Sequence, residues 1–247
     1  MERQFKIVIP SKGRSAAISS HRYVANSIIC VSESELEQYK SFNPDAEFVV
    51  HPDSIKGIAN KRQWIYDQFG DVFMMDDDLK GLARLTQKKG ESAKINPELA
   101  YWIIQNAGNL AVMTGCYLFG FNNFVRPEHY HGHTPFAMTG YINGCGLGMV
   151  KGATKLKFND SIKTNNDFYI CGLNAFHYRK AFIDKRYCFN QDSFGDNIGG
   201  CADVRTNEAE KSDYELLKMF FGNAIKLKTA GNTPAKHAHS KTLEIPF

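Results

Sequence analysis

Residues 71–79, Asp-Val-Phe-Met-Met-Asp-Asp-Asp-Leu, decide the fold expected for this chain. Residues 72–75 form a short apolar run with no polar gap, as expected of a central strand that is buried on both faces of a parallel sheet. Ligands of such sheets bind beyond the carboxyl ends of the strands. This strand ends in three aspartates, so the sequence places three carboxylates where a binding site is expected.

The spacing of these aspartates indicates a metal site. In an extended chain Asp76 and Asp78 point to one side and Asp77 points to the other. Two carboxylates on one side can hold a hard divalent cation, which prefers oxygen ligands and accepts phosphate oxygens as partners. A cation that carries a diphosphate would also offset the repulsion between the three charges. The alternative is a solvated acidic turn that caps a following helix.

Composition limits the class of protein. The 247 residues are 43% hydrophobic, enough for the core of an α/β enzyme domain, and the net charge of 30 − 26 = +4 permits a polyanionic partner without requiring one. The six cysteines contain no Cys-x-x-Cys pair, which fits a reduced, cytosolic protein better than a disulfide framework or a zinc cluster. No signal peptide or membrane-spanning run is evident, so we expect a cytoplasmic protein with no membrane partner.

The N-terminal third alternates between strands and helices. Strands are expected at residues 5–10, 27–31, 47–50 and 72–75, and helices at 32–39 and 58–69. This order predicts an α/β fold, a doubly wound and mostly parallel sheet with helices on both faces.

Two segments of this third carry groups that suit a nucleotide. The first strand runs through Pro10 and Ser11 to Arg14, and backbone amides and a guanidinium suit a base, a ribose or a phosphate. The helix at 58–69 carries Lys61 and Arg62 in its first turns, where positive charge opposes the helix dipole. A nearby diphosphate would explain these two residues, and a solvated basic helix face is the alternative.

The remainder of the chain is expected to be less regular. We expect a polar, lysine-rich loop at 79–96, a helix at 97–110, an apolar strand at 111–121, a helix at 208–221 and a last strand at 224–227. His129, His131 and His133 share a face in an extended chain and could bind zinc. The intervening Gly132 and the polar surroundings favour a surface or acceptor-facing loop instead.

Three segments together resemble the nucleotide-sugar half of a GT-A glycosyltransferase. They are residues 7–14 (IVIPSKGR), residues 57–62 (GIANKR) and the apolar strand that leads into the aspartates. In that family an Asp-x-Asp element holds manganese or magnesium against the diphosphate of the donor. The resemblance implies that Asp78 is a direct metal ligand and that Asp76 reaches both the metal and the ribose and sugar. It also implies one domain over residues 1–247, with a nucleotide-sugar-binding half at 1–80 and an acceptor-side half with a C-terminal tail at 81–247.

The resemblance extends to a glycine-rich strand and to an acidic helix start. Gly144 and Gly146 are similar to a small-residue segment that lies under the donor sugar, since glycine in a strand marks close approach of a ligand or another backbone. A bulged core strand is the alternative. Asp167 resembles the acid that opens the acceptor-side helix, although Asn166 stands where glutamate is often found. The resemblance implies a general base for an acceptor hydroxyl, and an N-cap is the alternative.

The C-terminal tail supplies further candidates for the metal. GT-A enzymes often complete the metal shell with a C-terminal histidine, and His237 and His239 match that position. Imidazole is an acceptable ligand for manganese. A frayed basic tail is the alternative.

Within GT-A, the short chain and the Asp-Asp-Asp form are most similar to phage glycosyltransferases that decorate hydroxymethylated pyrimidines in DNA, which are relatives of the base J glucosyltransferase. This resemblance implies a UDP-sugar donor, a divalent cation and a DNA acceptor, in the host cytoplasm if the chain is phage-encoded. Two alternatives stay open. One is a glycosyltransferase for glycan, lipid or protein acceptors, and the other is a non-catalytic module that binds a nucleotide sugar or a nucleic acid.

Overall fold

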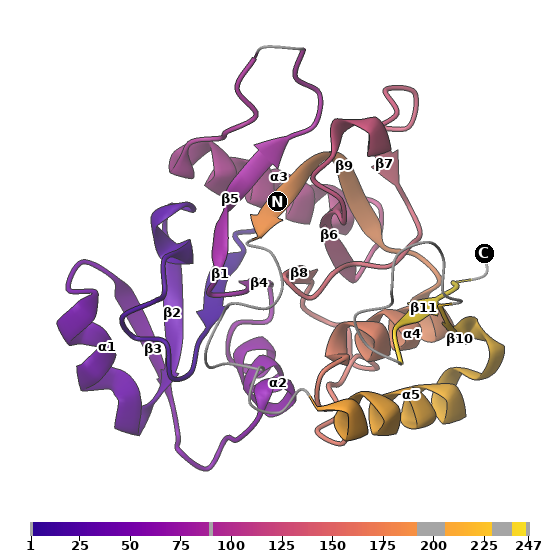
Figure 1. Cartoon of the computed structure of the whole chain (residues 1–247). Coiled ribbons are helices and arrows are strands. Elements are labelled where there is room, and N and C mark those ends of the chain that lie inside the picture. Colours follow the sequence, from indigo (N-terminus) through magenta and orange to yellow (C-terminus); the bar gives the residue numbers. More distant parts are fainter. Residues whose placement is uncertain (1, 89–90, 192–205, 229–238, 246–247) are drawn as a thin grey trace.

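The computed structural model describes residues 2–88, 91–191, 206–228 and 239–245 (Figure 1). Its strands are β1 (Lys6–Pro10), β2 (Ser27–Ser32), β3 (Glu47–His51), β4 (Val72–Met75), β5 (Leu79–Arg84), β6 (Leu118–Asn122), β7 (Phe136–Ala137), β8 (Gly146–Met149), β9 (Phe182–Gln191), β10 (Ile225–Leu227) and β11 (Lys241–Leu243). Its α-helices are α1 (Leu36–Phe42), α2 (Ile58–Phe69), α3 (Pro97–Met113), α4 (Asn166–Tyr178) and α5 (Asn207–Phe221). Short 3-10 helices are η1 (Ser20–Arg22), η2 (Glu33–Glu35), η3 (Pro127–His129) and η5 (Gly222–Ala224).

One large sheet organises the described part of the chain. Its strand order is β3-β2-β1-β4-β8-β6-β9-β5, with β7 paired to β9. Strands β3, β2, β1 and β4 pair in parallel, β8 runs antiparallel between β4 and β6, and β6 pairs in parallel with β9. Strands β5 and β7 pair antiparallel with β9. Only β5, β7 and β8 therefore oppose the common direction within this sheet, which is mostly parallel as predicted.

Each face of the sheet has its own core. On one face Ile7 of β1 and Phe73 of β4 pack with Ile104 and other buried residues of α3. On the other face the neighbouring residues Val8 and Met74 pack with α2 and α4. Successive side chains of a strand point to opposite faces, so apolar runs such as that of β4 supply both cores. Helices cover both faces, which confirms the predicted α/β fold class.

The expected elements of the N-terminal third are found with one correction. The predicted strands correspond to β1, β2, β3 and β4, and the helix at 58–69 is α2, ended by Gly70 with a φ of +71°. The helix expected at 32–39 begins later, because residues 33–35 form η2 and α1 starts at Leu36. Ser32 makes no capping bond to the backbone, and its hydroxyl donates to the Glu35 carboxylate at 3.0 Å.

The expectation of a polar loop over residues 79–96 is wrong for its first part. Strand β5 pairs with β9 at the end of the sheet, with Leu79 and Leu82 buried and Lys80 and Arg84 exposed. Lys80, one of the lysines that suggested a loop, lies with Arg84 on the solvent side of an edge strand. Charged side chains are common there because they discourage pairing with other chains.

The strand expected at 111–121 is wrong at its start. Helix α3 continues to Met113 with Ala111 fully buried, and β6 begins at Leu118. A short apolar run does not distinguish the end of a buried helix from a strand. Strands β9 and β11 were not predicted, whereas α5 and β10 match the predicted helix and strand. Among the described helices, none has both the length and the apolar character needed to cross a membrane.

Candidate active site

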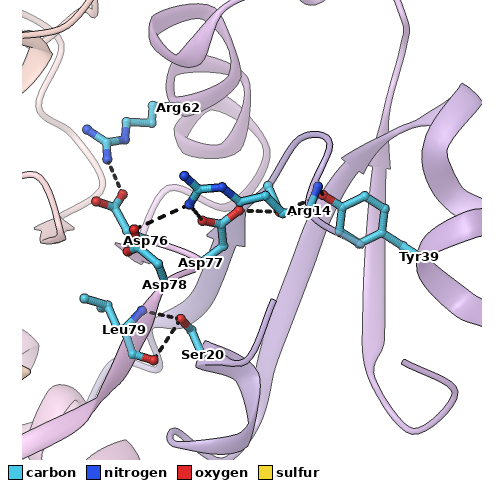
Figure 2. Close-up of polar contacts among 9 residues, drawn as sticks. Arg14, Ser20, Tyr39, Arg62, Asp76, Asp77, Asp78 and Leu79 are labelled. Carbon is cyan, nitrogen blue, oxygen red and sulfur yellow. Dashed lines mark hydrogen bonds and ion pairs between the residues drawn. The ribbon is translucent and has the colours of Figure 1, made fainter. Parts of the chain in front are cut away.

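An acidic site lies where β1 and β4 end side by side. Residues Val8 and Met74 are partners across these parallel strands, so Ser11 and the three aspartates follow the strands at the same edge of the sheet (Figure 2). The amide of Asp76 donates to the carbonyl of Cys145 at 3.0 Å, which brings the segment before β8 to this edge. Parallel sheets bind ligands at this edge.

The middle aspartate, Asp77, is a structural anchor. Its carboxylate accepts hydrogen bonds from the Ser11 hydroxyl and from Arg14 Nη1, both at 2.5 Å. The Tyr39 hydroxyl lies 2.7 Å from the Ser11 hydroxyl and accepts from the Arg14 amide at 3.0 Å. Burial raises the pKa of Asp77, and the bonds from Ser11 and the charge of Arg14 oppose that rise. Asp77 therefore ties the loop after β1 to the end of β4.

The other two aspartates are the accessible ones. The exposed fractions of the side chains are 34% for Asp76 and 21% for Asp78, against 8% for Asp77. Arg62 Nη2 lies 3.0 Å from Asp76, and Arg14 Nη1 lies 3.4 Å from Asp78 (Figure 2). Asp78 shares Arg14 Nη1 with Asp77, whereas Asp76 pairs with Arg62, so the expected division of Asp76 and Asp78 on one side from Asp77 on the other stays a prediction.

The negative charge at this edge suits a cation. Burial raises the pKa of Asp76 to about 7; Arg62 opposes the rise, and the charges of Asp78, Asp77 and Asp167 add to it. No three His, Cys, Asp or Glu side chains of the described ranges form a metal-binding group. A divalent cation held by Asp76 and Asp78 alone would therefore need its other oxygen ligands from a diphosphate and water.

Asp167 faces the same site from α4. The hydroxyl of Tyr141 and the amide of Gly144, the latter at 3.1 Å, both donate to Asp167 Oδ2, and the amide of Phe168 donates to Oδ1 at 2.9 Å. Arg62 Nη2 donates to the Gly144 carbonyl at 2.8 Å as well as to Asp76. Arg62 and Gly144 thus join the acidic strand end to Asp167.

The alternative that Asp167 is a helix cap is wrong. The N-cap position of α4 is Asn165, and Asp167 lies in the first helical turn. The expectation that a helix begins beside Asp167 is confirmed. The role of Asp167 as a base stays a prediction.

The two cations predicted to bind a diphosphate are buried in this structure. Lys61 Nζ donates to the Ser11 carbonyl at 2.6 Å, and burial lowers its pKa. Arg62 is also buried, and its Nε has no hydrogen-bond partner among the described residues. Neither residue forms the alternative, a solvated basic helix face. Lys61 fixes the loop after β1, and Arg62 links Asp76 to the Gly144 carbonyl.

A family model named TET-Associated Glycosyltransferase matches residues 5–199. The chain belongs to this family. The matched range contains Asp76, Asp78 and Asp167, and the protein is therefore a glycosyltransferase. No curated protein sequence matches the chain.

The chain also resembles solved structures of Staphylococcus aureus TarS at 10% sequence identity. TarS 1–349 covers 90% of this chain and 73% of its own length at a TM-score of 0.47. The match to TarS 1–349 in complex with UDP covers 86% of this chain and 65% of that one, at a TM-score of 0.45. The match to the structure titled TarS covers 86% of this chain and 39% of that one, at a TM-score of 0.44.

The two glycines predicted to lie near the donor sugar of the transferase have different surroundings. A Cβ atom on Gly144 would meet Arg62 Nη1 and the Asp167 side chain at 3.1 Å, so Gly144 borders the site. A Cβ atom on Gly146 would lie 2.7 Å from the ring of Phe189, inside the core. The packed ring of Phe189 explains why residue 146 is a glycine. A contact between Gly146 and the donor stays a prediction.

The structure describes one of the two C-terminal histidines predicted as metal ligands. His237 lies outside the described residues. His239 packs edge-on against Tyr214 of α5 with ring centroids 6.4 Å apart. Their role as metal ligands stays a prediction. His131 and His133 lie on an exposed loop with ring centroids 5.8 Å apart, as the surface-loop expectation requires.

A buried polar cluster behind Asp167 was missed by the sequence analysis. Asp213 of α5 is fully buried and accepts from the amides of Lys163, Thr164 and Asn165 at 2.7–3.0 Å. Lys241 of β11 donates to Asn165 Oδ1 at 2.7 Å and forms an ion pair with Glu210 at 2.9 Å. These bonds fix the turn that leads into α4. The sequence did not predict this contact, because Glu210 and Asp213 have the spacing of ordinary acids on an amphipathic helix. Lys241 lies far from both in the sequence.

Proposed function

We propose that this glycosyltransferase transfers a sugar from a UDP-sugar to the hydroxyl group of a hydroxymethylated pyrimidine in DNA, with a divalent cation at Asp76 and Asp78. One observation carries the proposal. The accessible carboxylates at the end of β4 and the carboxylate of Asp167 meet in one site, joined by Arg62 and Gly144. Such a site offers a donor side and an acceptor side.

The donor side consists of the loop after β1 and the end of β4. Asp76 and Asp78 would hold the cation, which when bound neutralises charge on the leaving diphosphate. Arg14 and Arg62 orient these two carboxylates through the contacts at 3.4 and 3.0 Å. Pro10 and Ser11, fixed at the end of β1, would border the nucleoside.

The acceptor side is built around Asp167. In an inverting reaction its carboxylate takes the proton of the acceptor hydroxyl while that oxygen bonds to the sugar and the bond from the sugar to the diphosphate breaks. Tyr141 and Gly144 hold Oδ2 in place, and the Phe168 amide holds Oδ1. Oδ1 keeps a lone pair for an incoming hydroxyl, since a carboxylate has about four acceptor sites and the two of Oδ2 are taken by Tyr141 and Gly144.

The choice of DNA as acceptor rests on the sequence resemblance. The family description names TET but no acceptor, so the hydroxymethylpyrimidine comes from the sequence resemblance. The net charge of +4 is compatible with a polyanionic acceptor.

The test is incubation of the protein and manganese with a panel of UDP-sugars and duplex DNA that contains either hydroxymethylcytosine or unmodified cytosine. We expect a glycosylated nucleoside, detected by mass spectrometry, only from the hydroxymethylated DNA. Donor hydrolysis without nucleoside modification would overturn the DNA acceptor and leave a transferase for another acceptor. No turnover of any donor would favour a binding module.

A further inference from the structure

A basic surface lies where the edge strand β5 meets the bend of β9. It consists of Arg84, Lys94, Phe136, Lys185, Arg186 and Tyr187, and we call it the edge surface. Arg84 pairs with Tyr187 across the two strands, and the amide of Leu85 donates to the Arg186 carbonyl at 2.8 Å. Lys94 bridges to Ala83 beside Arg84, and the Lys185 amide donates to the Pro135 carbonyl at 2.9 Å. Segments from three parts of the chain therefore meet here (Figure 1).

The edge surface carries positive charge without matching acids. Arg84 and Lys94 are exposed, and Lys185 is partly exposed. None of the three side chains forms an ion pair with a described residue, whereas Arg186 pairs with the buried Asp184 at 2.7 Å. Charged side chains on an edge strand are often explained by their role in blocking pairing with other chains. That explanation does not cover Lys94 and Lys185, which lie outside the edge strand β5. A concentration of unmatched cations attracts a polyanion.

The aromatic rings of the edge surface hold Arg186 in place. The guanidinium lies 4.8 Å from the ring centre of Phe136 and 5.3 Å from that of Tyr187. Phe136 also packs on Phe182 with ring centroids 5.5 Å apart. Arg186 and Phe182 contact the ring of Phe136, which stays 41% exposed. Proteins that bind single strands stack successive bases on aromatic rings. Both rings of this surface contact the Arg186 guanidinium, so the surface suits the phosphates of a duplex better.

Strand β5 links the edge surface to the active site. Strand β5 begins directly after Asp78 and ends at Arg84, a span of about 17 Å at 3.3–3.4 Å for each residue step. That span equals about five base pairs of a duplex. Asn123, directly after β6, donates to the Tyr141 carbonyl at 2.9 Å. The Tyr141 hydroxyl in turn donates to the Asp167 carboxylate.

We infer that the edge surface binds the phosphate backbone of duplex DNA that flanks the modified pyrimidine, through Arg84, Lys94 and Lys185. The inference rests on the proposed function, because it assumes a DNA acceptor. Arg186 stiffens the surface, and the three unmatched cations contact phosphates. The contacts carry no base specificity, since phosphates are the same in every sequence.

The test uses the triple variant Arg84→Gln/Lys94→Gln/Lys185→Gln of the full chain. A matched control is Lys6→Gln/Lys155→Gln/Lys157→Gln, which removes three exposed cations outside the edge surface, at the start of β1 and in the loop after β8. Binding of a short fluorescent duplex is measured by anisotropy across a range of salt. We expect the slope of log K against log salt to fall by about 2.7 for the edge variant, at 0.9 for each phosphate contact, and to stay unchanged in the control.

Donor hydrolysis without DNA separates this inference from the proposed function. The edge variant should hydrolyse the UDP-sugar used by the wild type at an unchanged rate, and its KM for DNA should rise while kcat at saturating DNA is kept. Wild-type affinity and slope in the edge variant would overturn the inference and leave the proposed function intact. A wild type that hydrolyses the donor but does not bind duplex DNA would overturn both the DNA acceptor and the edge surface. A loss confined to single-stranded DNA would overturn the assignment to a duplex.

Discussion

Tyr141 donates its phenolic hydrogen bond to Oδ2 of Asp167, the oxygen that also accepts from the amide of Gly144 at 3.1 Å. Burial and then the charge of Asp167 raise the pKa of Tyr141 well above its usual value, so the phenol remains a donor at neutral pH. The ring of Tyr141 packs against Phe168 with centroids 4.8 Å apart. Asp167 is therefore held by groups that keep its orientation during the reaction.

Replacement of Asp167 tests its role as a base. Asp167→Asn keeps the side-chain shape but cannot accept a proton, so turnover should fall by about 10²–10⁴-fold with donor affinity unchanged. Steady-state kcat and a donor dissociation constant on the same variant provide the measurement. Asp160→Asn, an exposed acid in the preceding loop, is the control. Near-normal turnover of Asp167→Asn would show that the base is another group or that the reaction is retaining.

Loss of the Tyr141 hydroxyl should reduce turnover without unfolding the protein. Tyr141→Phe keeps the packing on Phe168 and removes one hydrogen bond to a charged acceptor, which is worth about 1.5–3 kcal/mol. If that bond orients the base, kcat falls at least about tenfold, and the thermal midpoint falls by only about 3–12 °C, at about 2–4 °C for each kcal/mol. Equal kcat in this variant and the wild type would show that the amide of Gly144 orients Asp167 without help.

Removal of the metal or of its expected ligand should abolish transfer. Asp78→Asn weakens an oxygen ligand, so we expect no turnover and weaker donor binding in manganese. A chelator should stop the wild-type reaction, and added manganese should restore it. Calorimetric titration of the donor with and without manganese measures the coupling. Full activity of Asp78→Asn at saturating metal would contradict the assignment of Asp78, and activity in excess chelator would contradict the cation itself.

Two glycines of the same segment should respond in opposite ways to alanine. A Cβ atom on Gly148 would lie 2.2 Å from the ring of the buried Phe119, so Gly148→Ala should cost about 1–3 kcal/mol of stability by overpacking. A Cβ atom on Gly144 would meet only the side chains of Arg62 and Asp167, at 3.1 Å. Gly144→Ala should keep the fold and lose turnover. Urea unfolding and kcat on both variants check the contrast, and a stability loss confined to Gly144→Ala would contradict it.

Local patterns explain which parts of the site were predictable. Asp76 and Asp78 follow a continuous apolar strand, and Asp167 precedes an apolar helical stretch, so neighbours in sequence place all three acids. Gly144 and Gly146 have the same pattern, yet one borders the site and the other faces Phe189. That difference depends on residues far along the chain. Strand β5 also depends on distant residues. Its exposed Lys80 favoured a loop in the sequence analysis, and the strand becomes evident only from its pairing with β9.

The contact between Lys241 and Glu210 is the clearest case of such long-range structure, and it yields the last prediction. The side chains are 1% and 8% exposed and lie 2.9 Å apart. Lys241→Met leaves Glu210 charged and buried, which should cost about 3–5 kcal/mol, whereas the double variant Glu210→Gln/Lys241→Met removes both charges and should recover much of that loss. Urea unfolding with an unchanged m value measures both. Since the pair supports the turn before Asp167, the single variant should also lose kcat, and the double variant should regain part of it. An equal loss of stability in the two variants would show that the packing of Lys241, and not the compensation of charge, holds β11 against α4.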